Sequence, residues 1–322
     1  MLPIRIVNTT LTKEPGLKVN NQREVVCLIP FGSANEEISG ISHFFEHLII
    51  AFLLGSYRAK GGVVYGHTTE DYIILFAVNL SAQEIWTGFK EIDFAAMPLE
   101  RYRKTLLKEI DTERSNYEES FFSAVWMGTD YEKSPLGDAL RVKEITVTEL
   151  NGFREHVCRN NLYVYEPNNT AYIITPQWEV VPSRTPRVCS TGKAEKVMDG
   201  KHVNLYFFND QIETSYLLVQ ILKELNPGKQ VQLSEKKGLS VLIMEQGVQY
   251  PGPGNIDALR QHAIETIQAE ISEIKTNFQE TGLNELESLY FYQRPWKERI
   301  DQLMTTTSGE LLHHPFLALE QL

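Results

Sequence analysis

The sequence twice places a short apolar strand directly before an apolar helix, and this order limits the folds that the chain can adopt. Residues Glu24 to Pro30 predict a buried strand, and His43 to Leu54 predict the helix that follows. Val203 to Phe208 and Thr214 to Leu225 repeat that order farther along the chain. Mixed strands and helices of this kind indicate an α+β fold, and 322 residues are enough for two domains.

The boundary between the two halves is predicted from a polar segment that contains proline. Residues 176–200 hold three prolines among polar side chains, which is typical of a linker. We therefore expect a first α+β domain over residues 1–175, a linker over 176–200, and a second, shortened α+β domain over 201–322.

Two further patterns predict long helices. After Pro98, apolar residues recur at helical spacing up to Val125, which is the longest helical pattern in the chain. In the second half, Ile256 to Glu280 predict an amphipathic helix that ends at Gly282.

Composition and charge exclude several classes of function. A net charge of −11 argues against nucleic acid as a partner, and no apolar run is long enough to span a membrane. We see no secretory signal and expect a cytoplasmic protein. The three cysteines have no Cys-x-x-Cys spacing, which argues against a thiolate metal site: they are Cys27, Cys158 and Cys189.

The predicted helix from His43 carries a motif with metal chemistry. His43 and His47 are four residues apart, so both imidazoles lie on one face of a helix and can share one metal ion. Glu46 lies beside them, in the position of a general base that takes a proton from water. Ser39 or Ser42 could cap this helix. The alternative is a helix with two half-buried histidines and a solvated glutamate, but the apolar helix after a buried strand favours the metal site.

A zinc ion in a catalytic site has three protein ligands and one open position, so a third ligand must come from elsewhere. Glu109 and Glu113 lie along the edge of the apolar stripe on the long helix, and each could point inward. Glu118 and Glu119 are further candidates. Composition and spacing leave this choice open.

The segment from Pro30 to His47 closely resembles the active-site segment of the pitrilysin/insulinase family of zinc peptidases, which includes the mitochondrial processing peptidases. That family reads Gly-Ser-x-x-Glu and then Gly-x-x-His-Phe-x-Glu-His. Gly61 to Tyr72 resembles the family's Gly-Gly-x-x-Asn-Ala-x-Thr strand, and Ser134 to Gly137 resembles its Pro-Leu-Gly loop. The order His-x-x-Glu-His is the inverted zinc motif.

The resemblance implies two homologous α/β sandwich-like domains of the pitrilysin type, with the second one shortened and residues 1–175 as the catalytic, zinc-binding domain. It places the third zinc ligand on the long helix at Glu109, with Glu113 as the second choice. It also implies that a peptide substrate adds as a strand beside Tyr65, Gly66, His67 and Thr68, through backbone pairing. We do not expect His67 to be a ligand.

The second half departs from the family at two positions. Family members read Leu-Arg-x-x-x-Gly-Leu-x-Tyr, and the Arg and Tyr hold the substrate carbonyl; here these positions are Ser234 and Val241. The resemblance therefore implies a heterodimer in which a homologous partner subunit supplies the Arg/Tyr pair. We expect a zinc metallopeptidase that cleaves short unstructured peptides, such as precursor or leader peptides. The alternative is a non-catalytic peptide-binding or assembly subunit of the same fold.

Overall fold

The computed structural model shows an α+β chain that divides into two compact units, Val7–Val188 and Cys189–Leu322 together with Met1–Ile6. The described residues are 23–113, 125–166, 170–174, 192–198, 200–209, 211–237, 239–314 and 316. Among them, no helix combines the length and apolar character needed to cross a bilayer.

The first unit is built on a five-stranded antiparallel sheet with the order β2-β3-β1-β4-β5. Its strands are β1 (Glu24–Ile29), β2 (Val63–Thr68), β3 (Ile73–Val78), β4 (Leu162–Glu166) and β5 (Thr170–Ile174). The apolar run of the predicted first strand is β1, whose last five residues are buried because it lies in the centre of the sheet. Strand β2 lies at one end of the strand order of this sheet, as far as the described residues show.

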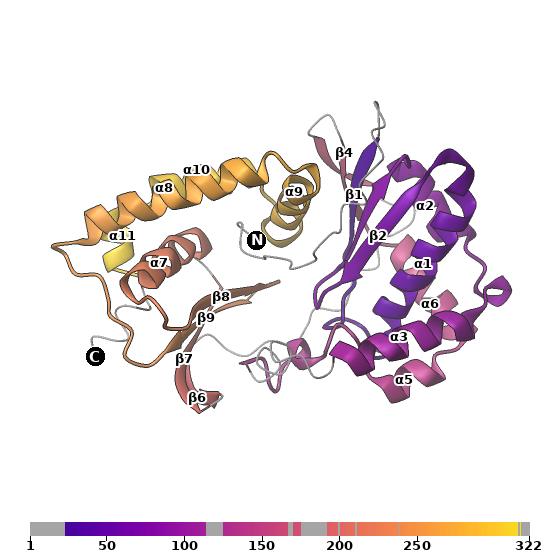
Figure 1. Cartoon of the computed structure of the whole chain (residues 1–322), viewed down its shortest axis with the longest axis horizontal. Helices are drawn as coiled ribbons and strands as arrows, with labels where there is room; N and C mark the ends of the chain where they lie inside the picture. The colour runs from indigo at the N-terminus through magenta and orange to yellow at the C-terminus, as the bar shows by residue number, and fades with distance from the viewer. Residues whose placement is uncertain are drawn as a thin grey trace. The chain divides into compact units, whose positions relative to one another are not determined.

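Helices cover one face of this sheet (Figure 1). They are α1 (Ile41–Tyr57), α2 (Ala82–Glu91), α3 (Leu99–Glu113), α5 (Ala139–Glu144) and α6 (Val147–Cys158), with short 3-10 turns at Arg58–Lys60, Phe94–Ala96 and Asp130–Glu132. Alternate residues of β1, such as Cys27, pack with Phe44, Phe45 and Leu48 of α1 in one buried cluster. The long pattern predicted to reach Val125 is described as α3 up to Glu113, and residues 114–124 lie outside the described residues.

The second unit has a four-stranded sheet with the order β6-β7-β9-β8. Its strands are β6 (Gly192–Met198), β7 (Lys201–Phe208), β8 (Val231–Lys236) and β9 (Leu239–Glu245). Three of these strands, with α7 (Ile212–Leu225) after β7, repeat the arrangement of β2, β3 and β1 with α1 after β1. Strand β6 lies within the segment 176–200 that was predicted as a linker; it has three charged residues and no long apolar run that would have marked it as a strand.

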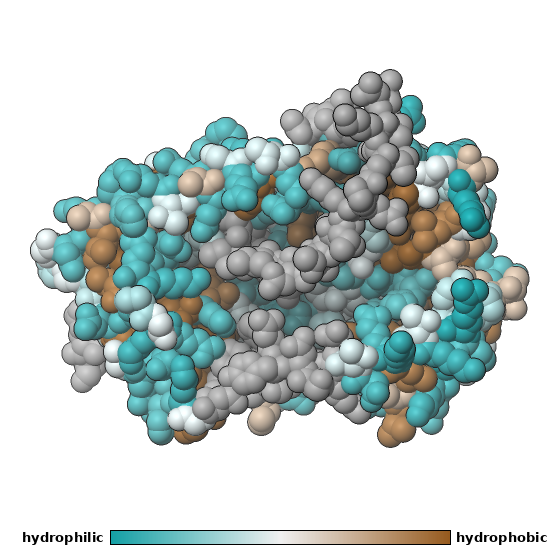
Figure 2. Space-filling view, in the orientation of Figure 1, coloured by the Kyte–Doolittle hydropathy of each residue, from teal (hydrophilic) through white to brown (hydrophobic). Residues whose placement is uncertain are grey.

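The helices of the second unit enclose a second buried cluster. Beyond α7 they are α8 (Ile256–Ile274), α9 (Phe278–Tyr292), α10 (Trp296–Thr305) and α11 (Ser308–Leu312). Residues such as Leu222, Ile267 and Leu303 pack in this cluster. Much of the visible surface is hydrophilic over α8 and α10, which agrees with their apolar residues facing inward (Figure 2). The predicted helix end at Gly282 is wrong: Asn277 caps α9, and α9 runs through Gly282.

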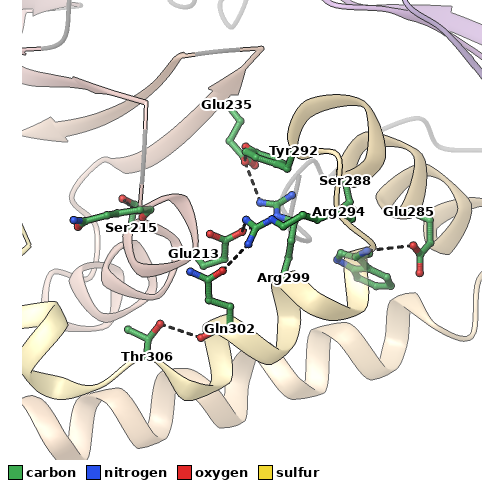
Figure 3. A network of polar contacts seen from close by, with 12 residues as sticks. Glu213, Ser215, Glu235, Glu285, Ser288, Tyr292, Arg294, Arg299, Gln302 and Thr306 are labelled. Atoms are coloured by element: carbon green, nitrogen blue, oxygen red, sulfur yellow. Dashed lines mark hydrogen bonds and ion pairs between the residues drawn. The ribbon is translucent and has the colours of Figure 1, made fainter. Parts of the chain in front are cut away.

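A buried ion network joins α7, β8 and α10 in the second unit (Figure 3). The Arg299 guanidinium has no exposed surface and donates to the Glu213 carboxylate at 2.8 Å and to Glu235 at 3.4 Å. Arg294 also donates to Glu213 at 3.0 Å, and the Tyr292 hydroxyl donates to Glu235. The guanidinium carbon of Arg299 lies 3.8 Å from the centre of the Tyr292 ring. Arg299 therefore compensates the charge of two buried carboxylates.

Replacement of Arg299 should be strongly destabilising. Arg299→Met removes the cation and leaves Glu213 and Glu235 buried, and loss of one partner from a buried pair costs about 3–5 kcal/mol. Urea unfolding of the full chain measures this loss. Lys297→Met, on the exposed face of the same helix, is the matched control and should change stability by less than about 0.5 kcal/mol. Equal stability of the two variants would contradict the role of Arg299.

Candidate metal centre

The N-terminus of α1 is held by a buried carboxylate in the segment between β1 and α1. The Glu36 carboxylate accepts hydrogen bonds from the backbone N–H groups of Gly40 at 2.6 Å and Ser42 at 3.1 Å. Ser39 and Ser42 were predicted as possible caps, but neither side chain caps α1. The Glu36 carboxylate already accepts from the N–H groups of Gly40 and Ser42. Burial raises the pKa of Glu36 to about 7, while the two N–H groups oppose that rise. The acidic residue of the Gly-Ser-x-x-Glu segment was the sequence signal for this cap.

The structure brings His43 and His47 of α1 together with Glu109 of α3. The His43 Nε2 and His47 Nε2 atoms lie 3.1 Å apart. Glu109 reaches both rings, with Oε1 at 3.5 Å from His43 Nε2 and Oε2 at 3.3 Å from His47 Nε2. One ligand atom from each residue lies within 4.8 Å of the others, and this is the single group of its kind among the described residues.

The charges in this group favour an ionised carboxylate. Hydrogen bonds from His43 and His47 hold the pKa of Glu109 well below its usual range. Burial disfavours the protonated form of His43, but the hydrogen bond to Glu109, the charges of Glu46 and Glu109 and the Leu136 carbonyl together raise the pKa of His43 above its ordinary value. Glu109 is therefore negatively charged at neutral pH, as a metal ligand must be.

The donor set fits a zinc ion. Two imidazole nitrogens and one carboxylate oxygen are the ligands of many catalytic zinc sites, which keep a fourth position open. The group could therefore hold a metal ion through His43, His47 and Glu109. Of the other predicted candidates, the side chain of Glu113 and all of Glu118 and Glu119 lie outside the described residues.

Glu46 lies on the same helix and is buried beside the group. The Thr68 hydroxyl at the end of β2 donates to Glu46 Oε2 at 2.8 Å, which fixes the carboxylate. Burial raises the pKa of Glu46, and the charges of His43 and His47 oppose that rise. A carboxyl group whose pKa is shifted toward neutrality is suited to take up and release a proton.

The four residues predicted to bind substrate lie on the edge strand β2. Tyr65 stacks on Phe76 of β3 with ring centres 5.3 Å apart. A Cβ atom at Gly66 would come within 2.3 Å of the Ile74 carbonyl oxygen, so this position requires glycine. The His67 ring is tilted relative to the Phe76 ring, with ring centres 6.2 Å apart.

Ser234 and Val241 lie in the second unit, directly opposite each other on β8 and β9. Val241 is fully buried. A serine hydroxyl and an apolar side chain therefore occupy the positions at which the pitrilysin family is expected to carry its Arg and Tyr.

Comparison with known proteins supports the fold. No family model and no curated protein sequence matches the chain. A structure from Alicyclobacillus acidocaldarius described as M16-like has a TM-score of 0.61 at 11% identity, over 90% of this chain and 88% of that one. The inactive domain of an M16 peptidase from Pseudomonas fluorescens has a TM-score of 0.58 at 12% identity, over 90% and 88%.

A third similar structure is the ferredoxin protease FusC, in complex with Arabidopsis ferredoxin. It has a TM-score of 0.57 at 15% identity, and the match covers 93% of this chain but 44% of that one. These similarities show that the chain has the fold of M16 peptidases, which is the pitrilysin type. The pitrilysin-type fold that the sequence resemblance predicted is confirmed.

Loss of the Glu109 carboxylate should abolish tight metal binding. Glu109→Gln leaves two imidazole ligands. Loss of a group that only supports a ligand lowers metal affinity about 10–100-fold, so loss of a ligand itself should lower zinc affinity by more than about 100-fold. Competition with a chelating dye measures the affinity. Asp111→Asn, exposed on the same helix, is the control and should bind zinc like the wild type. Tight binding by Glu109→Gln would show that the third ligand is another residue, with Glu113 the next to test.

Proposed function

We propose that this chain is a zinc-dependent peptidase that hydrolyses short, unstructured peptides. The observation that carries the proposal is the convergence of His43, His47 and Glu109 beside Glu46, on a fold shared with M16 peptidases. A carboxylate general base next to three metal ligands is an arrangement suited to metal-assisted hydrolysis of an amide.

The residues of the site divide the chemistry among them. A zinc ion, when bound, supplies Lewis-acid chemistry, which polarises a carbonyl group and makes water more acidic. Glu46 takes the proton from the attacking water and returns it to the leaving amine. Thr68 holds the carboxylate in place by its hydrogen bond.

Strand β2 is proposed as the binding site for the peptide. It is an edge strand among the described strands, and an edge strand can take up an extended peptide through backbone pairing, which makes few demands on sequence and excludes folded regions. Tyr65, Gly66, His67 and Thr68 would be neighbours of that segment, and Thr68 also contacts Glu46. Precursor or leader peptides are unstructured substrates of this kind.

Glu46→Gln separates catalysis from metal binding. The amide cannot act as a base, so turnover of an unstructured peptide should fall by at least about 100-fold, the usual contribution of general-base catalysis. Zinc content should stay at one ion per chain, because the ligands are unchanged. Elemental analysis and a peptide-cleavage assay measure the two properties. The control is Glu37→Gln, an exposed residue of the preceding loop. A fully active Glu46→Gln protein would contradict the assignment.

We further propose that a homologous subunit completes the active site. The shared strand order of the two units supports their common origin as homologous domains, yet the second carries Ser234 and Val241 where Arg and Tyr are expected. Neither side chain supplies a positive charge, and Val241 has no donor.

The isolated chain should therefore bind zinc but cleave peptides slowly. Donors for the developing oxyanion contribute about 3 kcal/mol, or two orders of magnitude in rate. Mixing with a homologue that carries the Arg/Tyr pair should raise cleavage about 100-fold and form a one-to-one complex, seen by light scattering. Mutation of that Arg or Tyr should remove the gain while zinc stays bound. Equal rates for the isolated chain and the mixture would contradict the heterodimer.

The second candidate is a non-catalytic subunit that binds peptides or supports an assembly. Replacement of the Arg/Tyr pair favours it, and an inactive M16 domain is among the similar structures. The complete set of His43, Glu46, His47 and Glu109 favours the peptidase. Cleavage by the mixture of subunits, lost in Glu46→Gln, distinguishes the two.

A further inference from the structure

We propose that the loop 133–138 is a positioning element of the metal centre, whose Leu136 carbonyl fixes the proton of His43 on Nδ1. This inference rests on the proposed metal site and adds to it the group that orients one ligand. His43 Nδ1 lies 3.4 Å from the Leu136 carbonyl oxygen, so a proton on Nδ1 points at an acceptor. The other nitrogen, Nε2, is then left with a lone pair, and it faces His47 and Glu109.

A hydrogen bond of this kind decides which nitrogen can bind a metal. Histidine ligands usually donate their second N–H to a carbonyl or carboxylate, which fixes the ring and its tautomer. The contact of 3.4 Å is longer than the usual 2.7–3.2 Å of an N–H···O bond. A small movement of the loop away from α1 would therefore break this hydrogen bond. The position of the loop thus determines whether His43 keeps its proton on Nδ1.

The loop is tied to the segment before α1 by three polar contacts. The Ser33 hydroxyl donates to the Lys133 carbonyl at 2.9 Å, and the Lys133 ammonium donates to the Glu36 carbonyl at 3.3 Å. At the other end of the loop, the Asp138 N–H donates to the Ser39 hydroxyl at 3.0 Å. These contacts link both ends of the loop to the residues that place the N-terminus of α1.

A contact between two glycines brings the loop against the helix. Gly40 and Gly137 both have positive φ angles, of 84° and 85°. A Cβ atom on Gly137 would lie 2.3 Å from the Cα atom of Gly40, and a Cβ on Gly40 would lie 2.6 Å from a methyl group of Val142. Any side chain at position 137 must therefore push the loop away from α1, and the Leu136 carbonyl away from His43.

The loop 133–138 and the N-terminus of α1 are therefore held in a fixed position relative to each other. The Glu36 carboxylate holds the helix N-terminus, and the same segment holds the loop. His43 is thus oriented by its own helix on one side and by a distant backbone carbonyl on the other. The Pro-Leu-Gly sequence supplies the turn and the glycine that this close approach needs.

The test compares two glycine variants of the full chain. Gly137→Ala should lower zinc affinity 10–100-fold, the usual effect of losing a partner of a metal ligand. Gly128→Ala is the matched control, because Gly128 has a φ of 83° but nothing within 4 Å of the added methyl group. It carries the same backbone strain without moving the loop, and its zinc affinity should stay within twofold of wild type.

The second measurement reports the tautomer of the His43 imidazole. In the zinc-loaded wild type, ¹⁵N NMR of labelled histidine should show His43 bound through Nε2, with a slowly exchanging proton on Nδ1. In Gly137→Ala that proton should exchange with solvent at least tenfold faster. Ser39→Ala removes one anchor of the loop without backbone strain, so it should show the same change, to a smaller degree, even if Gly137→Ala fails to fold.

The outcomes separate this inference from the proposed function. Wild-type proton exchange and wild-type zinc affinity in both Gly137→Ala and Ser39→Ala would overturn the role of the loop, whatever the peptidase activity. Coordination of His43 through Nδ1 would overturn it as well. A chain that binds zinc with the Nδ1 proton protected but cleaves no peptide, even when mixed with a homologue that carries the Arg/Tyr pair, would support the loop and contradict the peptidase. Absence of zinc binding by the wild type would overturn both.

Discussion

The candidate metal centre depends on the close packing of two helices from distant parts of the first unit. Helix α3 buries Leu106 and Ile110 in the core around α1, and Glu109 lies between them in sequence. Arg103 fixes the helix: it donates to the Val142 and Ile145 carbonyls, and its guanidinium lies 5.1 Å from the centre of the Phe44 ring. Because Phe44 is the neighbour of His43, the contact that aligns α3 also sets the reach of Glu109 to the two histidines.

Much of this centre could be predicted because its signals are local. The spacing of His43 and His47 fixes their shared face on any helix. The apolar run of β1 marks a central strand, and the helical stripe around Ile110 limits which glutamates can turn inward. The resemblance to a known family then selected Glu109 from several candidates that periodicity alone left open.

The remaining features are set by contacts between segments far apart in the sequence. A buried glutamate caps α1 although serines lie nearer, because the loop folds Glu36 back onto the helix N-terminus. Strand β6 has no apolar run because an edge strand can be polar on both faces. Helix α9 tolerates Gly282 inside it because the cap at Asn277 and tertiary packing outweigh its weak helix propensity. The pairing of Glu213 with Arg299, 86 residues away, leaves no local pattern at all.

The two units show how one strand-helix plan serves two purposes. In the first unit, residues 30–40 connect β1 to α1 and form the loop that carries Glu36 and anchors the segment with the Leu136 carbonyl near His43. In the second, only 209–211 separate β7 from α7, and the buried acid at the start of α7, Glu213, is neutralised by Arg299. A buried carboxylate already paired with arginine cannot also serve as a free ligand or base. In the second unit, Arg299 therefore engages both Glu213 and Glu235, and the candidate metal-ligand group among the described residues lies in the first unit.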